Sequence, residues 1–250
     1  MIYEPEDFAR KLLAELNMKR ADNPEEIAVR LRLTIEDADF DNLEGALVFR
    51  VDRAKGVVSV NKNIKELGRR NFTICHEIAH FVLPNHGSVK CKSKEIESWS
   101  SGINAQEVEA NRFAAELLLP NKEIYRIVNN KATIEVAKEI ATDFRASLTA
   151  TLLKCSEVTD EACAVVWSVN GKIEWVKKNE NFNLFIPKKD LDNQSVAYKL
   201  FQDNLNQHDE KAVYAETWVS NDDLPSDLEI WEDSISMPNY SGILTLLTLI

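Results

Sequence analysis

The sequence predicts a mixed α+β fold, and three observations support this class. Between residues 33 and 61, short runs rich in Val, Leu and Ile alternate with turn residues, which is typical of β-strands. Residues 64–83 and 105–119 instead carry apolar side chains at helical spacing. From residue 161 the strand pattern returns, with Asn170-Gly171 as the strongest hairpin signal in the chain. We therefore expect a small sheet with two main helices, then short helices, then a smaller α+β region.

The N-terminal part predicts two helices followed by three strands. Apolar residues recur at helical spacing within 6–16. A second, short helix should begin after Asn23, because Asn is a favoured N-cap and Pro24 suits the first helical position. The strands are expected at 33–35, 46–51 and 57–61, with a turn between the last two.

The two main helices each end at a proline, Pro84 and Pro120, because proline lacks the backbone N–H that would continue the ladder. Residues 84–103 are polar, and we expect them to form a mobile loop beside the functional site. Two or three short helices are expected between 121 and 157.

The region after residue 161 should form a second sheet. Strands are expected on both sides of Asn170-Gly171, and a helix over 195–205. Three further strand-like runs lie near 212–219, 228–235 and 241–250. Core packing is the expected role of four tryptophans here, Trp167, Trp175, Trp218 and Trp231.

These patterns divide the chain into three expected parts. The first is a domain over 1–130, and the second is a helical segment over 131–160 that is helix-turn-helix-like in its spacing. The third is a C-terminal α+β domain over 161–250, a candidate regulatory domain.

Composition places the protein among ordinary soluble globular chains. Its 250 residues can bury a sizeable core, and 44% are apolar. The acidic start Met1–Asp7 does not resemble a secretory signal, and the longest apolar run, 243–250, is too short to span a bilayer. We therefore expect a cytoplasmic protein without a membrane partner.

Charge and cysteine content narrow the possible partners. The net charge is −11, and residues 161–250 contribute −8 of it, so direct binding to nucleic acid is disfavoured and a basic protein partner is mildly favoured. The segment 134–158, the helix-turn-helix candidate, holds few basic residues. Four cysteines without a C-x-x-C pair are expected to be reduced thiols, mostly buried.

The chemistry is concentrated in the H-E-x-x-H motif of His76, Glu77 and His80. On a helix, positions i and i+4 share one face, so two imidazoles can bind one metal ion. Glu77 would then lie beside the metal and take a proton from a metal-bound water, which acts as the nucleophile. Histidine is rare in this chain, and the helical context that the motif requires is present. The motif predicts metal-assisted hydrolysis of a peptide bond.

The third metal ligand has two candidate sources. His86 has the spacing of a metzincin ligand, but Leu83 stands where that pattern requires Gly for a sharp turn. The alternative is a carboxylate of the second main helix, where Glu107 can project toward the metal and Asn111 could orient a ligating His. Glu109 falls nearer the apolar edge of that helix. The spacing alone leaves both sources open.

The two motifs together resemble the ImmA/IrrE family of metallo-endopeptidases. The resemblance rests on 71–81, Asn-Phe-Thr-Ile-Cys-His-Glu-Ile-Ala-His-Phe, and on 107–120, which begins Glu-Val-Glu-Ala-Asn-Arg-Phe-Ala. It extends over roughly residues 5–130. It implies a compact gluzincin-like fold with zinc held by His76, His80 and Glu107, with Glu109 in reserve and Glu77 as general base. His86 departs from the family in its spacing and could stabilise the oxyanion, bind substrate or be a plain surface histidine.

The resemblance also implies a partner. Members typically cleave or relieve helix-turn-helix transcriptional repressors, often in stress responses or mobile-element induction. We therefore expect a zinc endopeptidase acting on such a repressor; manganese or cobalt also fits a His2Glu site. The alternatives are a non-cleaving metal-containing regulator that sequesters a repressor or an antitoxin-like partner, and a DNA-binding transcription factor built on 134–158.

Overall fold

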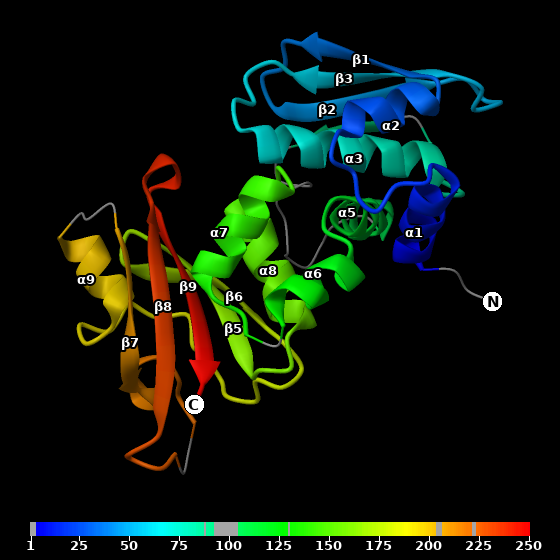
Figure 1. Cartoon of the computed structure of the whole chain (residues 1–250). Coiled ribbons are helices and arrows are strands. Elements are labelled where there is room, and N and C mark those ends of the chain that lie inside the picture. The colour runs from blue at the N-terminus through cyan, green and yellow to red at the C-terminus, as the bar shows by residue number, and fades with distance from the viewer. Residues whose placement is uncertain (1–3, 88, 93–104, 130, 204–206, 222–223) are drawn as a thin grey trace. The chain divides into compact units, whose positions relative to one another are not determined.

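The computed structural model describes residues 4–87, 89–92, 105–129, 131–203, 207–221 and 224–250 (Figure 1). The chain forms two compact units. Unit 1 comprises Met1–Glu123 and Ile140–Ser147, and unit 2 comprises Ile124–Glu139 and Leu148–Ile250. Helices and two sheets are both present, so the α+β class is confirmed. The expected division at residues 130 and 160 stays a prediction about separate domains.

Unit 1 contains a four-stranded sheet with strand order β1-β3-β2-β4 (Figure 1). β1 runs parallel to β3, and β2 lies antiparallel between β3 and β4. The strands are β1 (Leu33–Ala38), β2 (Leu43–Phe49), β3 (Gly56–Asn61) and β4 (Val89–Lys92). The three strands expected from the sequence are therefore present, each within a few residues of its predicted position.

Strand β4 corrects the expectation of an irregular loop after Pro84. Its sequence, Val-Lys-Cys-Lys, has no apolar run, so the pattern carries little strand signal. The strand forms because its backbone pairs with the free edge of β2, which is a tertiary event. The rest of the expected loop, residues 88 and 93–103, lies outside the described residues.

The described helices that accompany this sheet are α1 (Pro5–Glu15), α2 (Pro24–Arg30), α3 (Leu67–Val82) and α5 (Ala105–Leu118). The Asn23 side chain accepts a hydrogen bond from the backbone N–H of Glu25, as expected of an N-cap. α3 starts three residues later than predicted because Asn61 holds the preceding residues in a turn, accepting from the backbone N–H groups of Asn63 and Ile64.

Helix α3 is the central element of unit 1. One side packs against β2 and β3, and another side packs against α5 (Figure 1). Ile74 and Ile78 of α3 are fully buried. The predicted apolar face of α5 is buried as well, through Ala110, Phe113, Ala114, Leu117 and Leu118. Burial on both sides fixes the rotation of α3 about its axis and therefore the direction in which its polar side chains point.

Unit 2 is built on a five-stranded antiparallel sheet of order β6-β5-β9-β8-β7 (Figure 1). The strands are β5 (Cys163–Val169), β6 (Lys172–Lys178), β7 (His208–Tyr214), β8 (Glu229–Met237) and β9 (Gly242–Leu249). Its described helices include α8 (Leu148–Val158) and α9 (Val196–Gln202). Two other helices, α6 (Asn121–Val128) and α7 (Ile134–Asp143), have residues in both units. Short 3-10 turns lie at Ala215–Thr217 and Pro238–Tyr240.

The predicted hairpin at Asn170-Gly171 is confirmed. Both residues have positive φ, 51° and 74°, as the two central positions of a type I′ turn require. β5 and β6 pair on either side of them.

The expectation that the tryptophans pack in the core is confirmed for Trp218 but wrong for Trp231, which is 37% exposed. Trp231 lies on the face of β8 that α9 does not cover, and its indole N–H donates to Glu210.

Two neighbouring acids on β8 attach helices to opposite faces of this sheet. Buried Glu232 accepts a hydrogen bond from the backbone N–H of Ala197 at the start of α9, at 2.8 Å. Asp233 accepts one from the backbone N–H of Ile134 at the start of α7, also at 2.8 Å. Consecutive strand residues point to opposite faces, so each carboxylate can serve one helix N-terminus.

Across the described part of the chain, no helix combines the length and the apolar character that crossing a bilayer requires.

Candidate metal centre

Helix α3 presents the three motif residues inside unit 1. His76, Glu77 and His80 are all fully buried. The two imidazoles lie one turn apart on the same helix face, with ring centroids 4.8 Å apart. Because α3 is packed against both the sheet and α5, neither ring can turn out to solvent without disrupting the core.

Helix α5 brings Glu107 to the same point. One carboxylate oxygen of Glu107 lies 3.0 Å from Nε2 of His76, and the other lies 3.6 Å from Nε2 of His80. The two Nε2 atoms are 3.1 Å apart. Zinc with ligands at about 2.0–2.1 Å in tetrahedral geometry separates its ligand atoms by about 3.3 Å. The three distances are close to that value, so this donor set fits a tetrahedral metal ion.

The outer nitrogens of both imidazoles have hydrogen-bond partners. Nδ1 of His76 lies 2.9 Å from Oδ1 of Asn111, one turn after Glu107 on α5. Nδ1 of His80 lies 2.9 Å from Nδ1 of His86. An amide oxygen only accepts, so His76 donates from Nδ1 to Asn111. A His76 that binds a metal must therefore use the lone pair of Nε2, the nitrogen that lies beside Glu107.

His86 lies behind His80 rather than among the converging atoms. Its Nε2 is 2.9 Å from a carboxylate oxygen of Glu109, and its side chain is almost completely buried. Burial lowers the pKa of His86, against the opposing effect of Glu109. Within the described residues, the group of three possible metal ligands comprises His76, His80 and Glu107, whose ligand atoms all lie within 4.8 Å of one another.

Glu107 is held as a carboxylate. Burial opposes its ionisation, but hydrogen bonds with His76 and His80 outweigh burial, so the pKa of Glu107 is lowered. A carboxylate that is already deprotonated is a ready metal ligand. Its position in the first turn of α5 also favours the negative charge, because the helix dipole is positive there.

Arg53 was not anticipated from the sequence. It lies in the turn between β2 and β3, with a positive φ of 51°. Its guanidinium donates to the backbone oxygens of His80, Phe81, Leu83 and His86. Carbonyls at a helix C-terminus have no partner within the helix, so Arg53 caps α3 and ties the segment carrying His86 to it. A single arginine in a turn carries no sequence signal for this role.

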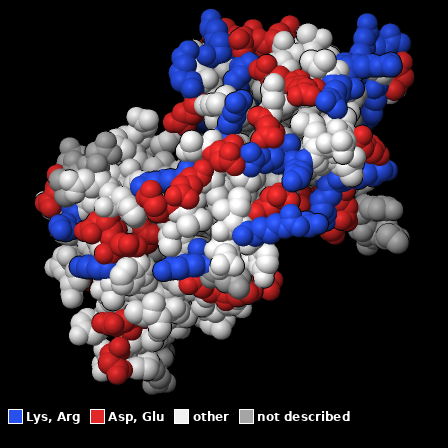
Figure 2. Space-filling model, in the orientation of Figure 1, with Lys and Arg blue, Asp and Glu red and all other residues white. Residues whose placement is uncertain are grey.

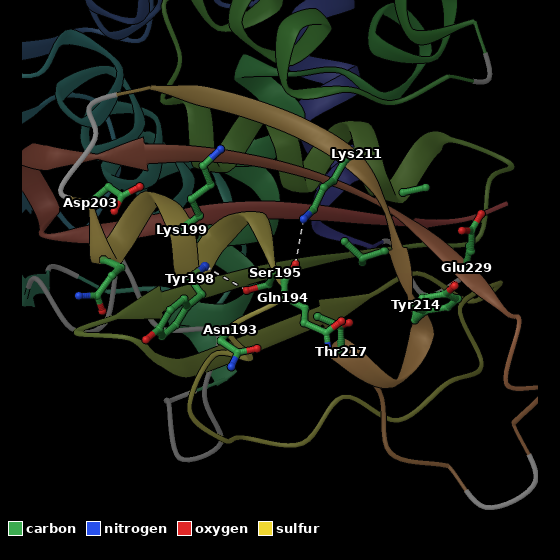
Figure 3. Close-up of a pocket in the computed structure, with 13 residues that line it drawn as sticks. Asn193, Gln194, Ser195, Tyr198, Lys199, Asp203, Lys211, Tyr214, Thr217 and Glu229 are labelled. Carbon is green, nitrogen blue, oxygen red and sulfur yellow. Dashed lines mark hydrogen bonds between the residues drawn. The ribbon is translucent and has the colours of Figure 1, made fainter.

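A concavity of about 550 Å³ lies within unit 2, between α9 and β7 (Figure 3). Tyr198 and Lys199 of α9 line one side, and Lys211 of β7 lines the other. The amine of Lys211 donates to the backbone oxygen of Gln194, and Lys199 pairs with Asp209 at 3.8 Å. Both cations are therefore already paired within the protein, and we assign no ligand to this concavity.

Comparison with known proteins identifies the family. Residues 25–156 match the family model Peptidase_M78, the IrrE N-terminal-like domain. The chain belongs to this family. The matched region contains both helices of the His-Glu cluster, so the IrrE-like resemblance seen in the motifs is confirmed.

Two relatives set the IrrE-like chain in context. It is 26% identical over 117 residues to "Uncharacterized immunity region protein 2" of Bacillus phage phi105, covering 46% of this chain and 70% of that protein. A solved structure, a Mycobacterium tuberculosis transcriptional regulator, superposes with a TM-score of 0.62 at 14% identity, covering 99% of this chain and 88% of the other. At that identity, the likeness shows a shared fold.

Proposed function

We propose that this IrrE-like chain is a zinc-dependent endopeptidase of the gluzincin type that cleaves a protein partner, a helix-turn-helix transcriptional repressor. The observation that carries the proposal is the convergence of His76, His80 and Glu107 in unit 1, with their ligand atoms within 4.8 Å. Family membership supports the peptidase class.

Each residue of the cluster has a distinct role in this proposal. His76, His80 and Glu107 would hold the metal, which when bound would supply an activated water and polarise the substrate carbonyl. Glu77, next to His76 on the same helix, would accept a proton from the attacking water and return it to the leaving amine. Asn111 and His86 orient the two imidazoles, and Glu109 orients His86.

The donor set bears on the identity of the metal. Two imidazole nitrogens and one carboxylate oxygen leave a fourth tetrahedral position for water or substrate, the pattern of catalytic zinc sites. Manganese and cobalt are also compatible with nitrogen and oxygen donors. Zinc is proposed because two imidazole nitrogens and one carboxylate oxygen are a donor set of catalytic zinc sites, and the separations of these atoms are compatible with it.

The partner is inferred from the relatives. One relative carries the name of an immunity-region protein of a phage, and one structural neighbour is a transcriptional regulator. Both names concern the control of gene expression, which supports a repressor as the substrate. A non-cleaving regulator is the alternative: it would sequester the same partner and hold a metal only for structure. The fully buried Glu77 favours hydrolysis, because a structural site has no need of that carboxylate.

Direct DNA binding through α7 and α8 is the weakest of the three functions. Six consecutive residues of α8, Thr151–Ser156, are buried, whereas a recognition helix must expose side chains to base edges. Acidic and basic side chains are interleaved on the face shown in Figure 2. DNA binding that weakens steeply with added salt would be needed to revive this function.

Metal content and cleavage test the proposal together. Wild type, Glu77→Gln and Glu107→Ala are loaded with zinc, desalted and analysed for bound metal. Each is then incubated with purified helix-turn-helix repressors and with a peptide library from digested cell proteins, and new termini are read by mass spectrometry. We expect one zinc in wild type and Glu77→Gln, none in Glu107→Ala, and cleavage by wild type alone.

The possible outcomes separate the alternatives. Cleavage by Glu77→Gln at the wild-type rate would rule out the proposed mechanism. A wild type that binds zinc and forms a stable complex with an intact repressor would support the non-cleaving regulator. A wild type that takes up no zinc would remove the metal centre altogether.

A further inference from the structure

Gly45 of strand β2 lies beside the carboxylate of Glu77. A methyl carbon added to Gly45 would lie 2.5 Å from Oε1 of Glu77 and 3.2 Å from its Cδ. It would also lie 2.9 Å from Cγ2 of Thr73. Separations under 3.0 Å are not tolerated between such atoms, so any side chain at this position must displace a neighbour.

A bulge in β2 turns Glu44 toward the same helix as Gly45. Between Leu43 and Gly45 the pairing with β4 shifts register, because Leu43 faces Lys92 and Gly45 faces Cys91. The extra residue is Glu44, and a bulge can turn two successive residues toward the same side. The Glu44 side chain reaches Arg69 and Thr73 on α3, and the vacant Cβ position of Gly45 also faces α3.

Of the two neighbours of Gly45, Thr73 is the one that cannot yield. Its hydroxyl lies 3.0 Å from the backbone oxygen of Arg69 and 3.3 Å from a carboxylate oxygen of Glu44. Arg69 in turn holds Glu44 through an ion pair. A rotation of Thr73 would break this buried set of contacts, so Thr73 can yield only through a small shift of the β2 backbone. The larger displacement therefore falls on the longer side chain of Glu77, whose Oε1 lies nearest the added carbon.

We propose that Gly45 is a positioning residue for Glu77: the absence of a side chain at this position leaves the space in which the carboxylate is held for proton transfer. This inference rests on the proposed function, because it assumes that Glu77 is the general base. Restoring an ordinary contact distance would move Oε1 by roughly 1 Å, and a displacement of that size can cost about 100-fold in rate.

Gly45→Ala separates positioning from metal binding. We expect it to bind one zinc, with an affinity within about twofold of wild type, because the three atoms nearest the added methyl group belong to Glu77 and Thr73 and not to the candidate ligands. We expect kcat on a cleaved peptide to fall about 100-fold, with KM little changed. Gly56→Ala is the matched control: its methyl group would meet Leu33, Phe49 and Val48 at 2.9 Å, and no residue of α3. It should lower the melting temperature and leave the kcat of the folded protein unchanged.

A double-mutant cycle read by melting temperature tests the packing of Gly45 against Glu77 without an activity assay. Gly45→Ala is compared with wild type, and Gly45→Ala/Glu77→Ala is compared with Glu77→Ala. If Gly45 makes room for Glu77, the added methyl group lowers the melting temperature less when the Glu77 side chain is absent. If Gly45→Ala alone does not fold, we expect the double variant Gly45→Ala/Glu77→Ala to fold, because the side chain that clashes with the added methyl group is absent.

The kinetic test and the melting-temperature test can fail for different reasons. Wild-type kcat in Gly45→Ala, or an equal loss of melting temperature in both backgrounds, would overturn the role of Gly45. If wild type cleaves nothing, the proposed function fails, and the melting cycle still decides whether Gly45 sets the position of the Glu77 side chain.

Discussion

Nδ1 of His86 lies 2.9 Å from Nδ1 of His80, on the side of the His80 ring opposite to the converging metal ligands. If His80 keeps the lone pair on Nε2 for a metal, it must donate from Nδ1 to His86. His86 then accepts at Nδ1 and donates from Nε2 to Glu109, 2.9 Å away. A chain of three side chains would thereby set the tautomer and direction of His80, and we propose that His86 is an orienting residue rather than a third ligand.

Replacing His86 should weaken the metal site without abolishing it. We expect His86→Ala to bind one zinc at saturation with an affinity lower by about 10- to 100-fold, the usual cost of losing a group that orients a ligand. Competition with a zinc chelator measures this, with Glu107→Ala as the variant expected to lose binding. Complete loss of zinc from His86→Ala would instead make His86 a direct ligand, as in the metzincin pattern.

The cap on α3 should contribute measurably to stability. Arg53→Ala leaves the partly buried carbonyls of His80, Phe81 and Leu83 without this donor. We expect the free energy of unfolding to fall by roughly 1–3 kcal/mol, measured by urea denaturation. Arg50→Ala is the control, because Arg50 is 64% exposed and pairs only with exposed Asp52 in the same turn, so its loss should cost less than about 1 kcal/mol. Equal losses in the two variants would contradict a capping role for Arg53.

Stability should respond to pH through Glu232. Burial raises the pKa of this carboxyl, although Trp218 and the backbone of α9 donate to it. The folded state therefore keeps the proton at pH values where the unfolded chain, with a Glu pKa of about 4.3, has lost it. The contribution of Glu232 to the free energy of unfolding is fully present below the pKa of the unfolded chain. It decreases as pH rises toward and through the folded-state pKa.

Comparison with Glu232→Gln isolates this contribution. As pH is raised from about 4 toward neutrality, the melting temperature of wild type should fall relative to that of the variant. Glu229→Gln, on the same strand but exposed, serves as the control for replacing a glutamate in β8. A constant offset for Glu232→Gln would mean that its carboxyl titrates alike in the folded and unfolded chains.

Three of the four thiols should be unreactive in the folded protein. Cys75, Cys155 and Cys163 are buried. Burial raises the pKa of all three thiols, and for Cys155 and Cys163 it raises the pKa to about 12. The thiolate is the reactive form, so iodoacetamide at pH 8 should modify these sites only after unfolding in guanidinium. Site-by-site mass spectrometry reads the result. Rapid native labelling of Cys75 would contradict the packing of α3.

Much of the local structure could be predicted from the sequence because it depends on near neighbours in the chain. Proline and asparagine mark the start of α2, and Asn170-Gly171 marks the β5–β6 hairpin. β4 and the exposed Trp231 could not be predicted, because one depends on pairing with β2 and the other on which face of its sheet α9 covers.

The sequence by itself determined that His76, Glu77 and His80 share one helix, because helical periodicity places i and i+4 on one face. It also determined the apolar face that buries α5. Only the tertiary structure decided between His86 and Glu107 as the group beside both imidazoles, placing Glu107 there and His86 behind His80. It likewise brought Gly45 and Arg53 to opposite ends of the motif. The contacts of Gly45, Arg53 and Glu107 with α3 join residues more than 20 positions apart. Their geometry depends on how α3 packs between a sheet and a second helix, which no local pattern encodes.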